Sequence, residues 1–184
     1  MSLLPQTFYH IYNRGNNKQL IFYNKDNYHF FLKKIRKHIL PHVEIVAYCL
    51  MPNHFHLMVQ PRLDFIQVNF SHDLKILLRS YARAVNNQER KTGSLFQQNT
   101  KIKPLKTGLN YPFICFHYIH QNPMKAGLVS KMEKWEMSSF RDYMGTGSEI
   151  LCNKGLAYDL LEIPASPEDF IEQSYAVQIL DYRI

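Results

Sequence analysis

The sequence predicts an α+β fold in which an antiparallel β-sheet carries helices on one face, and three observations point to it. Stretches in which apolar and polar residues alternate, as in strands, are interleaved with stretches of helical spacing. Their order along the chain is strand, helix, strand, strand, helix, strand. Hydrophobic residues make up 46% and charged residues 20% of the 184 residues, which favours one globular core over disorder.

The first strand and the first helix are bounded by loop and cap signals. Residues 7–13 alternate in apolar character and lead into the polar loop Arg14-Gly15-Asn16-Asn17. The glycine in this loop permits a close approach of the backbone to a ligand. Asn24-Lys25-Asp26 offers a helix cap, and apolar residues recur at helical spacing after it. We expect this helix to end at Pro41, because proline lacks the N–H that a helix needs.

A β-hairpin is predicted in the middle of the chain. Its strands are residues 43–51 and 54–60, because Pro52-Asn53 between them is typical of a turn. Pro61 ends the second strand, since proline cannot donate a hydrogen bond to a sheet.

A second helix and a fourth strand complete the predicted sheet. Ser71-His72-Asp73 is the expected helix cap, and the helix runs to about Arg90. Residues 95–105 alternate weakly and are interpreted as a strand. The whole order matches the split βαβ plan of a ferredoxin-like antiparallel sheet with two helices on one face.

The C-terminal third contains a further helix, a linker and a tail. Residues 111–121 have helical spacing, and Gly145-Thr146-Gly147-Ser148 is typical of a linker. Ser166-Pro167-Glu168-Asp169 is a good helix start, followed by an amphipathic stretch. We therefore expect one domain over residues 1–144 and a linker with an acidic C-terminal extension over residues 145–184.

The charge is distributed unevenly and indicates a polyanionic partner. Residues 1–143 carry 20 Lys and Arg against 8 Asp and Glu, a net +12, whereas residues 144–184 carry 2 against 7, a net −5. Twelve tyrosines and twelve phenylalanines provide rings on which bases could stack. The pattern favours nucleic-acid binding, with a merely solvated basic surface as the alternative.

Cysteine usage and hydropathy bear on the cellular environment. The three cysteines, Cys49, Cys115 and Cys152, are widely spaced among apolar neighbours, as expected of reduced thiols. No apolar run approaches the roughly 20 residues that span a bilayer. The first residues do not resemble a signal peptide, so we expect a cytoplasmic protein with no membrane partner.

Two histidines on the second hairpin strand are the first candidate site. In a strand, His54 and His56 project to one face while Phe55 between them projects to the other. Two imidazoles about 7 Å apart on one strand face can share a divalent metal ion or a phosphate. The alternative is that both are ordinary half-buried sheet residues.

A tyrosine on the third helix is the second candidate. Tyr118 and Asn122 are four residues apart, so they share a helical face if the last turn reaches Asn122. Taken alone, Tyr118 is better explained by packing; it becomes a candidate nucleophile only because the chain also carries the histidine pair. His117 and His120 are turned away from the face of Tyr118, so we expect structural or DNA-facing roles for them.

Several motifs occur together in one order over about residues 7–144 and identify a family resemblance. In order, they are Tyr9-His10-Ile11-Tyr12-Asn13-Arg14-Gly15-Asn16-Asn17, Tyr48-Cys49-Leu50-Met51-Pro52-Asn53-His54-Phe55-His56, Gly93-Ser94-Leu95-Phe96-Gln97, Tyr118-Ile119-His120-Gln121-Asn122-Pro123, Ala126-Gly127-Leu128-Val129 and residues 135–143. In these motifs the sequence resembles the REP-associated tyrosine transposases of the single-tyrosine HUH superfamily. It differs from the family where Phe96 precedes Gln97, because a tryptophan is often expected there.

The resemblance implies an enzyme that cuts and rejoins single-stranded DNA folded into hairpins. It implies that His54 and His56, with Asn122, bind Mg²⁺ or Mn²⁺, and that Tyr118 forms a 5′-phosphotyrosine intermediate. The rival hypothesis is a hairpin DNA or RNA binding protein of the same fold that has lost cleavage. The cognate DNA, the choice between monomer and dimer, and the base that activates Tyr118 stay open.

Seven further residues are predicted to contact DNA. The Arg14 loop is the candidate for reading a short strand beside the hairpin, and outward cations on the second helix and fourth strand are candidates for phosphate contacts. They are Asn13, Arg14, Gly15, Arg79, Arg83, Lys101 and Lys103.

Overall fold

A computed structural model describes residues 2–105, 110–147 and 151–177, and these ranges contain one antiparallel sheet. Its strands have the order β2-β3-β1-β4. They are β1 (Phe8–Arg14), β2 (Val43–Met51), β3 (His54–Pro61) and β4 (Lys101–Leu105). The helices are α1 (Lys25–His38), α2 (Gln67–Gln88), α3 (Tyr111–Lys125), α4 (Phe140–Tyr143), α5 (Lys154–Leu161) and α6 (Pro167–Ala176), with short 3-10 turns at Asn16–Lys18 and Met132–Lys134. The predicted ferredoxin-like α+β class is confirmed.

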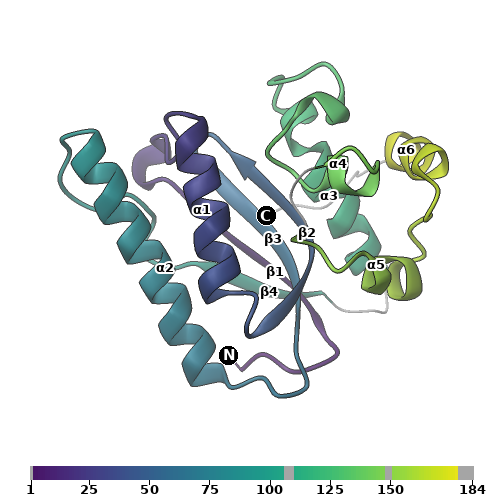
Figure 1. The fold of residues 1–184 in the computed structure, drawn as a ribbon, viewed down its shortest axis with the longest axis horizontal. Helices are drawn as coiled ribbons and strands as arrows, with labels where there is room; N and C mark the ends of the chain where they lie inside the picture. Colours follow the sequence, from purple (N-terminus) through teal and green to yellow (C-terminus); the bar gives the residue numbers. More distant parts are fainter. Residues whose placement is uncertain (1, 106–109, 148–150, 178–184) are drawn as a thin grey trace.

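The helices form two groups on either side of the sheet. Figure 1 shows α1 and α2 side by side over one face, and α3 to α6 gathered on the other side beyond β2. Each group covers an apolar core of its own, one between the sheet and α1 and α2, the other between the sheet and α3 to α6. The sheet is therefore buried on both faces.

Alternation along β3 divides its side chains between the two cores. Phe55, Leu57 and Val59 belong to the core under α1 and α2, whereas Met58 belongs to the core under α3. His56 shares the parity of Met58 and projects to the α3 side. The prediction that the two histidines project opposite to Phe55 is confirmed.

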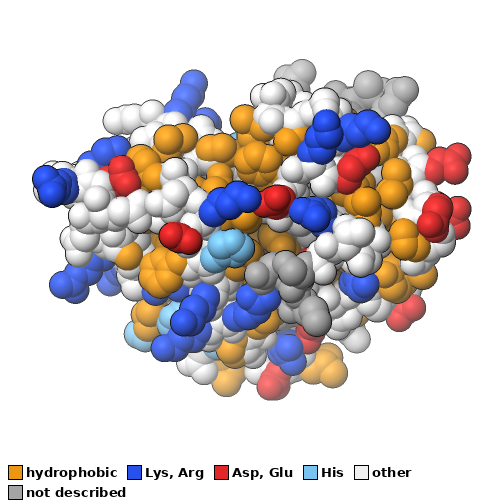
Figure 2. All heavy atoms as spheres, turned by 45° about the horizontal axis from the view of Figure 1, so that its top comes forward, with side chains coloured by type: hydrophobic (Ala, Val, Ile, Leu, Met, Phe, Trp, Pro, Cys, Tyr) orange, Lys and Arg blue, Asp and Glu red, His pale blue; other side chains and the backbone are white. Residues whose placement is uncertain are grey.

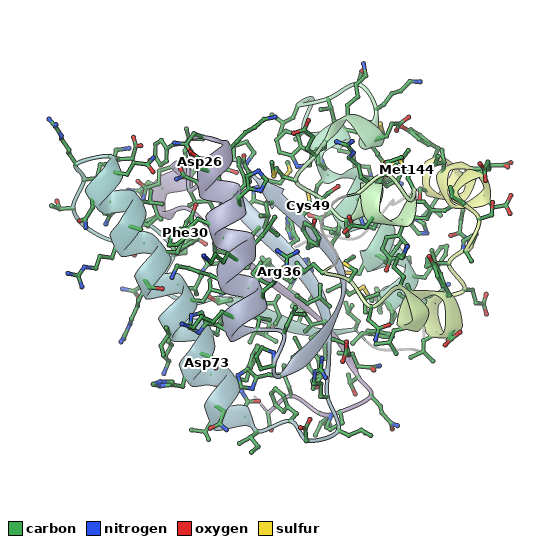
Figure 3. All side chains as sticks on the ribbon, in the orientation of Figure 1. Asp26, Phe30, Arg36, Cys49, Asp73 and Met144 are labelled. Carbon is green, nitrogen blue, oxygen red and sulfur yellow. The ribbon has the colours of Figure 1, made fainter. Side chains whose placement is uncertain are left out.

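Aromatic rings join α1 to α2. Phe30 points from α1 toward α2 and stacks on Tyr81, with the ring centroids 6.0 Å apart (Figure 3). Phe31 packs edge-on against the same tyrosine at 4.8 Å. The buried Tyr81 hydroxyl donates to the carbonyl of Ile21 at 2.7 Å, so its polar atom is satisfied inside the core.

Two predicted boundaries need correction. The second helix begins at Gln67 rather than at the predicted cap Ser71, which lies inside the helix and accepts a hydrogen bond from the Gln67 side chain at 2.9 Å. The predicted strand over residues 95–105 is regular only in β4. Leu95 and Phe96 are both buried although they are adjacent, which breaks strand alternation, and only Phe96 forms an isolated bridge to Gly15. The predicted caps Asn24 and Ser166 are confirmed.

The C-terminal segment packs into the second core. The N–H of Asn153 donates to the carbonyl of Ile45 on β2 at 2.8 Å. Phe170 of α6 is fully buried and its ring lies 4.9 Å from that of Phe140 and 5.3 Å from that of Tyr143. The sequence did not predict α5. Of the predicted linker, Ser148 lies outside the described residues, and the domain division after residue 144 stays a prediction.

The charge asymmetry of the sequence is visible on the surface. Several acidic side chains lie along the right-hand edge in Figure 2, on the side where Figure 1 shows α5 and α6. Over the described residues, no helix is both long and apolar enough to cross a membrane. Cys49 and Cys115 are buried, Cys152 is partly buried, and all three are free thiols.

Truncation of Phe170 tests whether the C-terminal segment shares the core. Because Phe170 is fully buried among aromatic rings, Phe170→Ala should lower the free energy of unfolding by about 3–5 kcal/mol. The control is Leu160→Ala on α5, where the side chain is 54% exposed and the loss should stay within about 0.5 kcal/mol. Urea denaturation measures both, and equal small losses would show that α6 adds nothing to the core.

Candidate active site

A cavity of about 370 Å³ opens where β1, β3 and the segment before β4 meet. It is lined by Tyr12, Asn13, Arg14, His54, His56, Gln97, Asn99 and Lys101. The pairing of β1 with β3 builds it, because Tyr12 lies opposite His56 and Arg14 opposite His54. The described lining contains two cations and no carboxylate, so the cavity favours an anionic ligand.

The two predicted histidines lie side by side in this cavity. Their ring centroids are 4.9 Å apart in an edge-to-face arrangement. His54 donates its Nδ1–H to the side-chain oxygen of Asn53 at 2.6 Å, which leaves the lone pair on its Nε2. Burial, and to a lesser degree the nearby charge of Arg14, lower the pKa of His54 to about 4. His54 is therefore neutral at pH 7.

A third histidine contacts the pair. His10 of β1 is fully buried, and its Nε2 lies 2.9 Å from Nδ1 of His56. Burial, followed by the charge of Lys103, lowers the pKa of His10 to about 3. Burial, followed by the repulsion that protonated His10 and His54 would exert, holds the pKa of His56 well below its usual value. All three imidazoles are neutral at pH 7, and neutral imidazole is the form that binds metals.

The donor atoms present fit a divalent metal in part. Nε2 of His56 is buried and has no hydrogen-bond partner among the described residues, so an imidazole nitrogen is available beside that of His54. The described part of the chain holds no group of three His, Cys, Asp or Glu side chains arranged for a metal. A metal at the pair would therefore need further ligands, from a side-chain amide or from the substrate.

Tyr118 of α3 faces the same histidines. Its ring meets those of His56 and His10 edge-on, with centroids 5.7 Å and 6.1 Å apart. Burial raises the pKa of Tyr118 to about 12, and a hydrogen bond from the Asn122 side chain opposes this shift. The structure thus brings together the predicted nucleophile and the predicted metal-binding pair, which lie about 60 residues apart in the sequence.

Asn122 lies on the same face of α3, one turn after Tyr118. The helix extends to Lys125, so the expectation that its last turn reaches Asn122 is confirmed. The amide nitrogen of Asn122 donates to the backbone carbonyl of Tyr118 at 2.8 Å. This contact fixes the amide beside the tyrosine, and its role as a metal ligand stays a prediction.

The face of α3 that carries His120, rather than the face of Tyr118, is joined to β2 by a buried polar network. Nε2 of His120 lies 2.7 Å from the hydroxyl of Ser139, which also accepts the N–H of Tyr48 at 2.9 Å. His117 and His120 are both buried, which settles the choice between a structural and a DNA-facing position for them. Cys49, labelled on β2 in Figure 3, is paired with His56 of β3. Because Cys49 is adjacent to Tyr48, the polar network contacts β2 one residue away from the partner of His56.

The predicted DNA-contacting cations do not all lie at this cavity. Arg14 and Lys101 line it, and the ammonium of Lys103 lies 5.7 Å from the centre of the Tyr12 ring. Arg79 lines a second cavity of about 350 Å³ between α2 and residues 93–100. Arg83 is exposed on α2 and lines neither of these two cavities.

Asn13 and Gly15 hold the segment before β4 in place. Asn13 is buried and donates to the carbonyl of Gln97 at 3.2 Å and to the hydroxyl of Thr100 at 2.9 Å. Gly15 is also buried, and a Cβ there would lie 2.0 Å from the carbonyl oxygen of Gln19. Asn13 lines both cavities, and contact of either residue with DNA stays a prediction.

Four residues at the site were missed in the sequence: His10, Tyr12, Gln97 and Asn99. The alternation of residues 7–13 places His10 and Tyr12 on one strand face, which was a usable signal. It did not reveal which strand would lie beside them. Gln97 and Asn99 were read as part of a regular strand, whereas they belong to an irregular segment.

Comparisons with known proteins find similarity both in sequence and in structure. The chain is 28% identical over 109 residues to a Haemophilus influenzae protein named as a REP-associated tyrosine transposase, and the match spans 53% of the chain and 58% of that protein. A solved structure of a REP-associated tyrosine transposase bound to a REP hairpin has a TM-score of 0.61 and 19% identity, covering 99% of this chain and 95% of that one. At that identity the structural match shows the shared fold. No protein-family model matches. The predicted resemblance to REP-associated tyrosine transposases is confirmed.

Removal of the Ser139 hydroxyl tests the anchoring of α3. Ser139→Ala leaves Nε2 of His120 and the N–H of Tyr48 buried without this partner, so the free energy of unfolding should fall by about 1–3 kcal/mol. Ser138→Ala is the matched control, because that hydroxyl makes only a 3.4 Å contact with the N–H of Phe140. Thermal denaturation compares the two variants. Equal stability losses would contradict an anchoring role for Ser139.

Proposed function

We propose that the chain is a metal-dependent tyrosine transposase that cleaves and rejoins single-stranded DNA beside hairpins, as a member of the REP-associated group. The observation that carries this proposal is the position of Tyr118, whose ring centroid lies 5.7 Å from that of His56, which in turn lies 4.9 Å from that of His54. The name of the Haemophilus influenzae relative and the REP hairpin bound to the solved structure support the substrate class.

His54 and His56 would hold the metal through their Nε2 atoms, with the side-chain amide of Asn122 as a further ligand. Mg²⁺ or Mn²⁺ fits a site that combines imidazole with oxygen ligands and lacks thiolates. When bound, such an ion neutralises charge on the scissile phosphate and orients it for in-line attack.

Tyr118 supplies the nucleophile of the cleavage step. Its hydroxyl oxygen forms a bond to phosphorus while the bond from phosphorus to the 3′ oxygen breaks. The products are a 5′-phosphotyrosine and a free 3′-OH. Tyr118 loses its phenolic proton and the departing 3′ oxygen gains one, so no proton is released overall. The covalent bond retains the phosphodiester energy, so attack by a 3′-OH rejoins the strand without ATP.

The environment of Tyr118 keeps the hydroxyl protonated until it reacts. A pKa near 12 means that the phenol is neutral at pH 7, so proton removal accompanies the attack. The hydrogen bond from Asn122 favours the phenolate and partly offsets the effect of burial. Asn122 thus contacts the nucleophile directly in addition to its proposed role at the metal.

The rim of the cavity supplies the phosphate contacts. Arg14 and Lys101 line it, and Lys103 lies beside Tyr12 at its edge. Because the described lining has no carboxylate, a DNA strand meets no like charge there. These three cations would hold the phosphates that flank the scissile bond.

Replacing Tyr118 with phenylalanine separates cleavage from binding. Tyr118→Phe keeps the ring that packs on His56 and His10, so the fold and hairpin affinity should stay at wild-type levels. Cleavage and any adduct that survives denaturation should disappear. Tyr111→Phe is the matched control, because Tyr111 begins the same helix but is 37% exposed.

The readout is a denaturing gel of end-labelled hairpin DNA incubated with each protein and Mn²⁺. EDTA should stop cleavage by the wild type and by Tyr111→Phe alike. A Tyr118→Phe protein that still cleaves would contradict the assignment of the nucleophile. A wild-type protein that binds hairpins but neither cleaves nor forms an adduct would favour the binding-protein alternative.

A charge substitution tests the phosphate contacts. Arg14→Gln should weaken hairpin binding several-fold and reduce the slope of log affinity against log salt by about 1, as expected for the loss of one phosphate contact. Arg62→Gln serves as the control, because Arg62 follows the opposite end of β3 and pairs with Glu44 at 2.8 Å. Fluorescence anisotropy at several salt concentrations measures both. An unchanged slope in Arg14→Gln would remove Arg14 from the interface.

A further inference from the structure

The bond between His10 and His56 gives the proposed metal site a supporting residue that the function above does not use. His10 Nε2 and His56 Nδ1 are 2.9 Å apart, and both side chains are buried. The register of the sheet creates this pair, because His10 lies opposite Met58 and therefore diagonal to His56 on the same face. The inference rests on the proposed function, since it concerns the metal bound there.

Two neutral imidazoles at this distance require one donor and one acceptor. If His56 donates its Nδ1–H, its Nε2 keeps a lone pair and can bind a metal. If His10 donates instead, the proton of neutral His56 sits on Nε2, and that nitrogen cannot bind a metal. The direction of a single hydrogen bond therefore decides whether His56 is a competent ligand.

Two observations favour donation by His56. His54 already shows the same arrangement, because its Nδ1–H donates to Asn53 and leaves Nε2 with its lone pair. Nε2 of His56 has no partner among the described residues, so a proton placed there would be a buried donor left unsatisfied. A lone pair at the same position would instead face a metal shared with His54.

We propose that His10 is a positioning residue that accepts the Nδ1–H of His56 and so fixes the tautomer and ring orientation in which His56 binds a divalent metal. Metal-binding histidines commonly donate their second N–H to such a partner, and loss of the partner lowers metal affinity by about 10- to 100-fold. Here the partner is another histidine, whose ring contacts those of Tyr12, 4.8 Å away, and Tyr118, 6.1 Å away.

The test measures Mn²⁺ affinity directly, from the EPR signal of free Mn²⁺, without reference to cleavage. His10→Leu removes the acceptor and puts an apolar side chain of similar bulk in its place, so Mn²⁺ affinity should fall by about 10- to 100-fold. His10→Gln places an amide oxygen near the position of Nε2, accepts the same N–H, and should retain most of the affinity. Met58→Leu changes the buried residue opposite His10 and should bind as the wild type does.

The outcomes separate this inference from the proposed function. Equal Mn²⁺ affinity in wild type and His10→Leu would overturn the role of His10 and leave the metal site standing. A wild-type protein without Mn²⁺ affinity would overturn the metal site and this inference together. Failure of His10→Gln to bind better than His10→Leu would also contradict it, because the acceptor would then have no effect.

A second measurement uses the wild-type protein alone and so does not depend on the folding of any variant. Long-range ¹H–¹⁵N NMR of the imidazole rings, recorded without metal, reports which nitrogen carries the proton. The inference requires that His56 carry its proton on Nδ1, as His54 does. A proton on Nε2 of His56 would overturn it.

Discussion

The alternation of side chains along β3 is the constraint on which both the core and the site depend. Phe55 enters the core under α1 and α2, and the two histidines on either side of it must then face α3. A shift of one residue in the pairing would place Phe55 among polar groups and the imidazoles in an apolar core. The energy of burying the apolar residues of β3 therefore also fixes the direction of the histidines.

The same constraint explains why the α3 side of the sheet is unusually polar for a buried face. His10, His56 and His120 are each almost fully buried, and each forms a hydrogen bond with a neighbouring ring or hydroxyl. Buried polar groups without partners are costly, so the His120–Ser139 contact, with Ser139 bonded in turn to Tyr48, holds α3 against β2. The C-terminal helices add apolar contacts around this network through Phe170, which packs on Phe140. The helix that carries the proposed nucleophile is thereby held against the strand that carries the proposed metal-binding pair.

Much of this arrangement could be predicted from local sequence, and the failures have physical causes. The proximity of His54, His56 and Tyr118 was predicted because strand and helix periodicity, together with the family motifs, act over a few residues. His10 was missed because its contact with His56 depends on the register between strands 46 residues apart in sequence, which no local pattern encodes. The start of α2 was placed too late because Ser71 resembles a cap, although the helix begins at Gln67 with no side-chain cap at all. Residues 95–100 were taken for a strand, whereas Asn13 holds them in an irregular path that shapes the cavity.

Tyr118 is the residue proposed to join the protein covalently to DNA, and Tyr12 is the strongest competitor because it lines the cavity beside His56. The most direct test is to isolate the adduct formed by the wild-type protein with hairpin DNA and Mn²⁺, digest it with protease and nuclease, and locate the attached nucleotide by mass spectrometry. We predict a 5′-linked nucleotide on the peptide that contains Tyr118. A nucleotide on Tyr12 or on any other residue would contradict it, as would cleavage products formed by water with no protein–DNA adduct at any time.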